Sequence, residues 1–172
     1  MNLFQHGSEP AMAEGMEHEP DSGGVAMTLT RPVAVVMERT PLASRWQSDK
    51  WEAKGVLPDI FGEAAAPRTL YDDGKRLEVL YPGFEIRLKG EELESYFLNL
   101  TSPQPKAFVL VRADDGTPRP ACVSLSYARG AGWMDANETV DAVPLPPELH
   151  AWVGEFVERY YRPRPKFKRA RK

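Results

Sequence analysis

Hydrophobic and polar positions alternate in short runs through the middle of the chain, which is the pattern of a β-rich domain. Residues 33–37 form an apolar, β-branched run that predicts a buried strand, and residues 51–57 predict a second strand. Residues 84–89 alternate apolar and charged side chains, which is the two-residue period of a strand with one face in water. At least three strands are therefore expected before residue 90.

Turn residues separate further strand-like segments. Asp72-Asp73-Gly74 predicts a turn into a strand at residues 75–80, and Pro82-Gly83 predicts a second turn. A short helical turn is plausible at residues 90–94, and residues 96–100 read as another strand. Residues 107–111 and 121–127 flank Asp114-Asp115-Gly116, which predicts a hairpin. Gly130-Ala131-Gly132 reads as a strand-to-helix connection, with a short helix within residues 129–137.

The end of the patterned region predicts an amphipathic helix. Pro146 and Pro147 are compatible with a first helical turn. An apolar stripe then recurs at steps of mostly three and four residues, formed by Leu149, Trp152, Val153, Phe156 and Tyr160. We therefore expect a single α+β domain over residues 28–161, with a mainly antiparallel β-sheet of six or seven strands packed against a C-terminal amphipathic helix.

Charge changes sign between the two ends of the chain. Residues 1–27 carry five acidic side chains and no Lys or Arg, whereas residues 159–172 carry eight basic side chains and no acid. We expect residues 1–27 to be a disordered acidic tail and residues 162–172 a disordered basic tail. Because the middle of the chain is net acidic, the composition disfavours a nucleic-acid partner, and a tail-driven nucleic-acid binder is the third alternative.

Other features of the sequence bear on the compartment. The single cysteine excludes an intramolecular disulfide, and neither a signal peptide nor an apolar run of membrane-spanning length is visible. A cytoplasmic protein without a membrane span is expected. The patterned sequence begins directly after Met27, and a translation start at Met27 is therefore a hypothesis that the intact mass of the native protein tests.

The sequence offers little catalytic chemistry. With one cysteine and three histidines there is no zinc-like spacing, and there is no glycine-rich nucleotide loop. Cys122 is expected to be a small buried hydrophobe rather than a nucleophile paired with His150. Both Asp-Asp pairs are expected to form turns. We therefore predict no catalytic residue, no metal site and no cofactor.

Two segments form a candidate interaction surface, because Trp and Arg concentrate at protein interfaces. One is the stretch around two tryptophans and the other is the basic tail. The candidate residues are Arg45, Trp46, Trp51, Arg162, Arg164, Lys166, Lys168 and Arg169. The alternative is that both tryptophan rings pack in the core or cap an open end of the sheet, and that the tail only aids solubility.

Several blocks resemble the bacterial family catalogued as domain of unknown function 3305 (DUF3305), over about residues 32–165. The blocks are Pro32-Val33-Ala34-Val35-Val36-Met37-Glu38-Arg39; Arg45-Trp46-Gln47 with Trp51 and Val56; Tyr81-Pro82-Gly83-Phe84; Leu98-Asn99-Leu100-Thr101-Ser102-Pro103 with Pro105-Lys106; Val123-Ser124-Leu125-Ser126-Tyr127; and Asp141-Ala142-Val143-Pro144-Leu145-Pro146-Pro147-Glu148. The resemblance implies that the protein is encoded beside molybdenum- or tungsten-dependent formate dehydrogenases and their maturation factors. It carries no established catalytic residues.

From this resemblance we expect a non-catalytic accessory or assembly protein of a molybdenum-dependent formate dehydrogenase, with the dehydrogenase subunits or maturation factors as partners. The alternative is a small enzyme or cofactor-binding protein in molybdopterin cofactor maturation. Its candidate residues, whose polar groups suit a phosphorylated pterin, are Arg45, Lys50, Asn99, Ser102 and Lys106.

Overall fold

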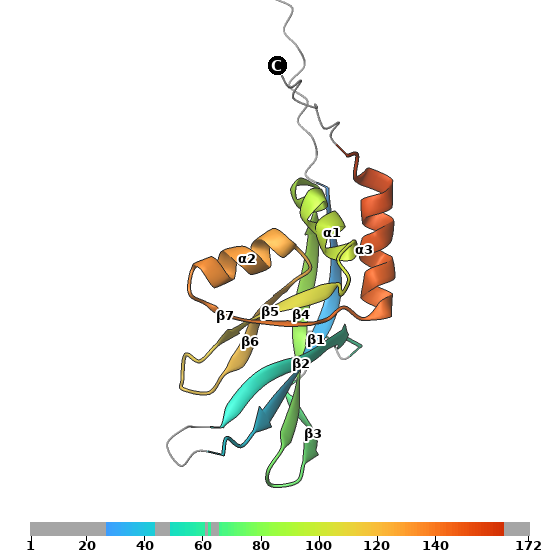
Figure 1. Ribbon diagram of the computed structural model, residues 1–172. Coiled ribbons are helices and arrows are strands. Elements are labelled where there is room, and N and C mark those ends of the chain that lie inside the picture. The colour runs from blue at the N-terminus through green and yellow to red at the C-terminus, as the bar shows by residue number, and fades with distance from the viewer. Residues whose placement is uncertain (1–26, 44–48, 61, 63–65, 164–172) are drawn as a thin grey trace, which may run out of the picture.

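A computed structural model describes residues 27–43, 49–60, 62 and 66–163, and confirms the α+β prediction. This part of the chain contains seven strands, three α-helices and one short 3-10 helix (Figure 1). Their order is β1 (Thr28–Thr40), β2 (Lys50–Pro58), β3 (Arg68–Asp72), β4 (Leu77–Lys89), η1 (Gly90–Glu92), α1 (Leu93–Leu100), β5 (Lys106–Arg112), β6 (Arg119–Ser124), α2 (Tyr127–Asp135), β7 (Thr139–Pro144) and α3 (Pro147–Tyr160).

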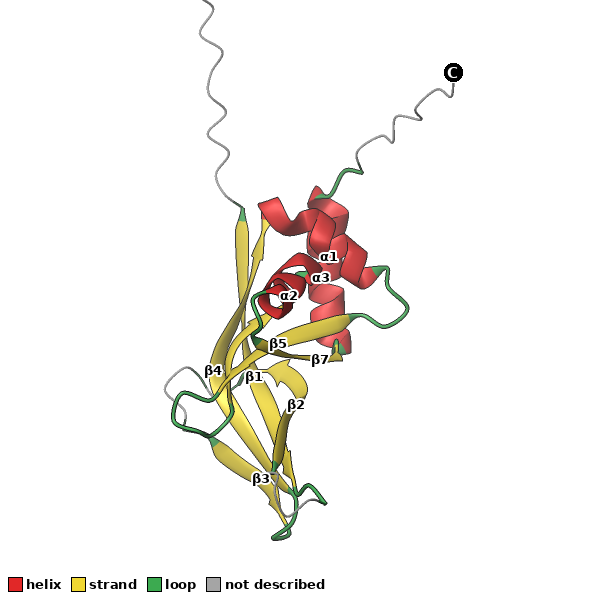
Figure 2. Ribbon diagram, turned by 60° about the vertical axis from the view of Figure 1, so that its left-hand side comes forward, coloured by secondary structure: helices red, strands yellow, loops and turns green. Residues whose placement is uncertain are grey.

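The strands are divided between two antiparallel sheets rather than forming one. The first has the order β2-β1-β4-β3 and the second has the order β6-β5-β7. Figure 2 shows that the first sheet is long, that the second crosses its upper half, and that the helices gather at the upper end. This arrangement leaves the hairpin ends of the first sheet at the opposite end of the molecule from the helices.

The core lies between the two sheets and the helices. The inward positions of β1, among them Val33 and Val35, are fully buried together with Ile86 and Leu88 of β4. Helix α3 confirms the predicted stripe, because its buried residues are Leu149, Val153, Phe156 and Val157. Helix and sheet thus exclude water from one shared apolar interior, which is the main stabilising term of the fold.

The predicted turn at Pro82-Gly83 is wrong, because β4 runs through both residues without a break. Gly83 has a φ of +85°, and the register of β1 against β4 shifts between Val33 and Val35. Gly83 also donates its backbone N–H to the Asp59 carboxylate at 2.8 Å. A bulge that needs a glycine looks like a turn in the sequence, but here it only bends a continuous strand.

Residues 96–100, predicted as a strand, belong to helix α1. The buried residues of this helix are Tyr96 and Asn99, which lie three positions apart. Five residues are too few for periodicity to separate a helix from a strand. Gly130 is likewise inside α2 rather than in a connection before it, and a Cβ at this position would lie 2.6 Å from the Phe108 ring.

The sequence analysis missed two strands, β3 and β7. All five residues of β3 are exposed, so no alternation marks it, and β7 follows α2 after a short connection. Both strands are defined by pairing with a partner, β3 with β4 and β7 with β5. No described helix is long and apolar enough to cross a bilayer.

Candidate binding groove between the first strand and the last helix

Strand β1 has an open edge near its start. It pairs with β4 from Thr28 onward, but its pairing with β2 begins only at Val33. Residues 29–31 therefore have β4 on one side and pair with no described strand on the other, whereas Pro32 meets Asp59 just after the end of β2. Such an edge presents backbone donors and acceptors that another chain can use.

The direction of the backbone groups along this edge follows from three observations. Gly90 donates its backbone N–H to the Met27 carbonyl at 2.9 Å, so alternate residues after Met27 also bond to β4. The Pro32 carbonyl instead accepts from Asp59 at 3.1 Å, on the opposite side. A proline is compatible with position 32 because the backbone of this residue faces away from β4, so pairing with β4 requires no N–H from it. Thr30 shares this orientation, so its N–H and C=O point toward the open edge.

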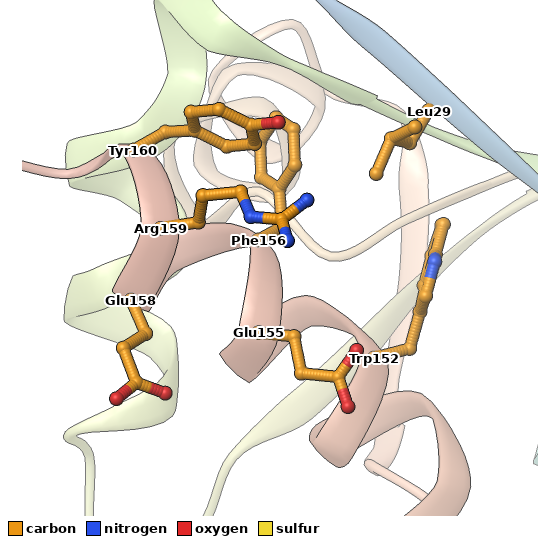
Figure 3. Close-up of a pocket in the computed structure, with 7 residues that line it drawn as sticks. All are labelled: Leu29, Trp152, Glu155, Phe156, Glu158, Arg159 and Tyr160. Carbon is orange, nitrogen blue, oxygen red and sulfur yellow. The ribbon is translucent and has the colours of Figure 1, made fainter.

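Helix α3 lies beside this edge, and a hollow of about 390 Å³ separates the two. We call this hollow the β1–α3 groove, and Figure 3 shows its lining side chains: Leu29, Trp152, Glu155, Phe156, Glu158, Arg159 and Tyr160. Leu29 is 43% exposed although its side chain is apolar. The groove therefore combines a strand edge with a helix flank.

The aromatic side of the groove is fixed by the helix. Phe156 is buried and packs edge-on against Tyr160, with the ring centroids 5.3 Å apart. Trp152 is half-buried, and the Arg31 guanidinium lies 5.7 Å from the centre of its ring. Arg31 also donates to the Glu148 carbonyl at 3.3 Å. Arg31 thus spans from β1 to the first turn of α3 and holds Trp152 in place.

Charged side chains form the outer rim. Glu155, Glu158 and Arg159 are all exposed on α3, and the Arg159 guanidinium lies 5.9 Å from the centre of the Tyr160 ring. The rim therefore carries charges of both signs beside an apolar floor.

A second hollow of about 550 Å³ lies between α1, β5 and α2. Its lining residues are Leu98, Asn99, Ser102, Pro103, Gln104, Lys106, Phe108 and Tyr127. It contains three of the five residues suggested for a pterin. Lys50 lies elsewhere, at the start of β2 in an ion pair with Glu52, and Arg45 falls outside the described residues.

Asn99 is already engaged in this second hollow. Its amide nitrogen donates to the Lys106 carbonyl at 2.7 Å and to the Leu125 carbonyl at 2.8 Å. Its amide oxygen accepts from the Lys106 N–H at 2.9 Å. Since Asn99 is also buried, these bonds fix the loop after α1 and leave the side chain little capacity for a ligand.

The described members of the predicted interaction surface lie at opposite ends of the molecule. Trp51 pairs with Arg39 near the end of β1, whereas Arg162 lines a hollow with Gly90, whose N–H bonds Met27. Thirteen residues of β1 separate these ends, which is about 40 Å. The remaining candidates lie outside the described residues: Arg45, Trp46, Arg164, Lys166, Lys168 and Arg169.

Trp51 is half-buried and packs against the core, which is the alternative role considered for it. Arg162 is exposed and donates to the carbonyl of Tyr161 at 2.9 Å. Trp51 therefore contributes partly to the packing of the core. The β1–α3 groove is a further candidate site, which the sequence analysis did not identify. Its main signal in the sequence was the apolar stripe of α3.

A charged cluster on the outer face of the first sheet was not foreseen. Lys54 binds the carboxylates of both Glu38 and Glu78, and Arg76 lies 3.6 Å from each. Hydrogen bonding to Lys54 lowers the pKa of Glu78, and the same carboxylates raise the pKa of Lys54. The cluster joins three neighbouring strand segments through side chains that are far apart in the sequence.

The structure shows where the residues that the sequence analysis weighed for catalysis or metal binding lie. Cys122 is a half-buried free thiol in β6, and His150 is exposed on α3. The turn role of the Asp pairs is confirmed for Asp72 and Asp115, which accept backbone N–H groups two residues on at 2.9 and 3.0 Å. Burial raises the pKa of the Tyr96 phenol. The described residues contain no group of His, Cys, Asp and Glu suited to a metal ion.

Comparison with known proteins gives one match. The family model described as "Protein of unknown function (DUF3305)" matches residues 32–171. Neither the curated proteins nor the solved structures contain a match. The matched range covers all three α-helices and the strands of both sheets except residues 28–31 at the start of β1, so it includes the α3 side of the groove but not Leu29. The chain belongs to the DUF3305 family.

Proposed function

We propose that this protein is a non-catalytic accessory factor of a cytoplasmic, molybdenum-dependent formate dehydrogenase, and that it holds a segment of a dehydrogenase subunit or maturation factor in the β1–α3 groove. The partner system is the one that the resemblance to this family implies. The observation that carries the binding role is the hollow between an open strand edge and an aromatic helix flank.

The composition of the groove supports binding of a protein. Trp and Tyr rings are enriched at interfaces because they bury a large area and keep a polar group at the rim. In this groove Trp152 and Tyr160 are both half-buried, so each has a ring surface that a partner would cover. Leu29 adds an exposed apolar side chain from the strand.

Affinity purification of the tagged full chain from its own host, grown with formate and molybdate, tests the proposal. Mass spectrometry should identify dehydrogenase subunits or maturation factors. The Glu155→Lys variant reverses an exposed charge on the rim and should reduce their recovery about tenfold. The Asp135→Lys variant is the matched control, because Asp135 is exposed at the end of α2, away from the groove. Recovery without any such component, or equal recovery by both variants, contradicts the proposal.

Cofactor binding is the second candidate, favoured by the meeting of Ser102 and Lys106 at the hollow beside α1. The flat Tyr127 ring also lines it, and a ring face suits an aromatic ligand. Isothermal titration of the full chain with molybdopterin nucleotide tests this function. Heat that disappears in Lys106→Met supports it, and absence of heat together with an unchanged melting temperature rejects it.

A further inference from the structure

We propose that the acidic N-terminal segment of this chain, residues 9–19, docks in the second hollow, between α1, β5 and α2. This contact goes beyond the accessory function, because it involves a different surface and no partner protein. Residues 9–19 lie outside the described part of the chain, so the described hollow and the sequence carry the proposal. The segment acts as a cover that any other ligand of the hollow must displace, and a chain that starts at Met27 lacks this cover.

The second hollow has an apolar rim that no described element covers. Leu98 is 53% exposed and Tyr127 is 57% exposed, although both side chains are large and mainly apolar. The floor is the buried Phe108, whose ring meets Tyr127 edge-on with the centroids 6.1 Å apart. The three hydrogen bonds of Asn99 fix the adjoining loop. The hollow is therefore preformed, and an occupant that covers its rim is stabilised by the apolar area removed from water.

The charge of the hollow is positive. Lys106 is the one charged side chain among the lining residues, and it is half-buried. The ion pairs within the described part of the chain involve other Lys and Arg side chains, so the Lys106 ammonium has no carboxylate partner there. A cation beside an apolar surface favours an occupant that combines carboxylates with apolar side chains.

Residues 9–19 have this composition. They contain no Lys or Arg, and Met12 and Met16 are their large apolar side chains. Methionine adapts to irregular hollows and makes favourable contacts with aromatic rings, which Phe108 and Tyr127 supply here. The acidic residues beside the methionines are Glu9, Glu14, Glu17 and Glu19. One of these carboxylates can pair with Lys106 while the methionines cover the rim.

The described chain begins close to the hollow. The Met27 carbonyl accepts a hydrogen bond from the Gly90 N–H at 2.9 Å, and Gly90 leads through η1 into α1, which carries Leu98. The helical path from Gly90 to Leu98 is about 12 Å long, whereas the chain from Met16 to Met27 spans up to about 36 Å when extended. The segment therefore reaches the hollow, and its tether raises its local concentration there.

The basic end of the chain and a second copy are the competing alternatives. Residues 162–172 carry seven Lys and Arg side chains, which repel Lys106, so the basic end does not suit this hollow. The basic end can instead pair with the acids of residues 9–19, but salt screens that attraction and leaves the burial of methionine intact. A segment from a second copy lacks the tether, so its binding depends on protein concentration.

Photo-crosslinking of the full chain at about 0.15 M salt tests the contact. With Leu98 replaced by the photoreactive amino acid benzoylphenylalanine, mass spectrometry of the irradiated monomer should find crosslinks to residues 9–19. Leu70 is the matched control position, because it is 52% exposed in β3, at the opposite end of the molecule from the helices. Equal yields from both positions, or crosslinks from position 98 mainly to residues 162–172 or between two copies, overturn the proposal.

Variants of the full chain separate the apolar and the charged contacts. Met12→Ser combined with Met16→Ser should lower the crosslink yield about tenfold. Lys106→Gln should lower it about two- to fivefold, whereas Lys75→Gln, at an exposed cation in the turn before β4, should not. In the unmodified chain, NMR should show NOEs from the methyl group of Met12 or Met16 to the Tyr127 ring. Absence of these NOEs, or an unchanged yield in the methionine variant or in Lys106→Gln, overturns the proposal.

Discussion

The carboxylate of Asp141 in β7 accepts a hydrogen bond from the backbone N–H of Ala53 in β2, at a donor–acceptor distance of 2.6 Å. Ala53 lies beside a bulge, where Lys54 is an extra residue between the paired positions Ala53 and Gly55. The two strands belong to different sheets. A side chain therefore supplies the bond that no neighbouring strand makes, and it ties the edges of the two sheets together.

This bond predicts a graded loss of stability. Asp141→Ala leaves the partly buried N–H of Ala53 without its acceptor and should lower the free energy of unfolding by about 1–3 kcal/mol. Asp141→Asn keeps an acceptor oxygen and should lose less. Urea denaturation measures both, with Asp135→Ala at an exposed position as the control. Equal stability of Asp141→Ala and the control would show that the bond contributes nothing net.

Two glycines of α2 should respond in opposite directions to the same substitution. A Cβ on Gly130 would lie 2.6 Å from the Phe108 ring, so Gly130→Ala should be destabilised by about 1–3 kcal/mol despite a better helix former. Gly132 has open space around it, so Gly132→Ala should be stabilised by up to about 1 kcal/mol. Chemical denaturation of both variants checks this, and stabilisation by Gly130→Ala would mean that α2 packs less closely on β5.

Asn99 should behave as a structural residue. Asn99→Ala removes three hydrogen bonds, two to carbonyls of Lys106 and Leu125 and one from the Lys106 N–H, inside a buried site. We expect a loss of roughly 2–4 kcal/mol in the free energy of unfolding. The exposed neighbour Leu98 supplies the control variant Leu98→Ala, which should be nearly neutral. A ligand-binding role for Asn99 predicts the reverse, with unchanged stability and lost binding.

The outer-face cluster predicts a pH dependence with a definite sign. Lys54 lowers the pKa of Glu78 below 4.5, its usual value, so the folded state binds this proton less readily than the unfolded chain does. The stabilisation is complete above pH 4.5 and is lost as the pH falls through the lower folded pKa. Glu78→Gln should therefore flatten the acid limb of a plot of melting temperature against pH.

Thermal melts from neutral pH to about pH 3 measure this limb. Lys54→Met provides the complementary test, because it leaves Glu38 and Glu78 facing each other with only Arg76 nearby. Loss of the Lys54 hydrogen bond then removes the main cause that lowers the pKa of Glu78, and acidification should cost this variant less stability than the wild type. An acid limb unchanged in both variants would show that the cluster does not contribute.

Local sequence was sufficient for elements whose signal lies within the element itself. The apolar stripe of α3 and the Asp-Gly hairpin between β5 and β6 were found because period and turn chemistry depend on near neighbours. The α+β class, with antiparallel strands and a C-terminal helix, followed from these elements, but the division of the strands between two sheets did not. Strand β3 could not be found in this way, because all its residues are exposed and only pairing with β4 defines it.

The same distinction explains the candidate sites. The sequence determined the composition of the groove walls, the apolar and acidic residues of α3, but not the groove itself. Leu29 and Trp152 are more than a hundred residues apart, and the groove exists because β2 stops pairing with β1 at Val33 while α3 packs beside the exposed edge. Periodicity reports which face of one element is buried, whereas an open edge and a hollow depend on where neighbouring elements end, and only tertiary packing decides that.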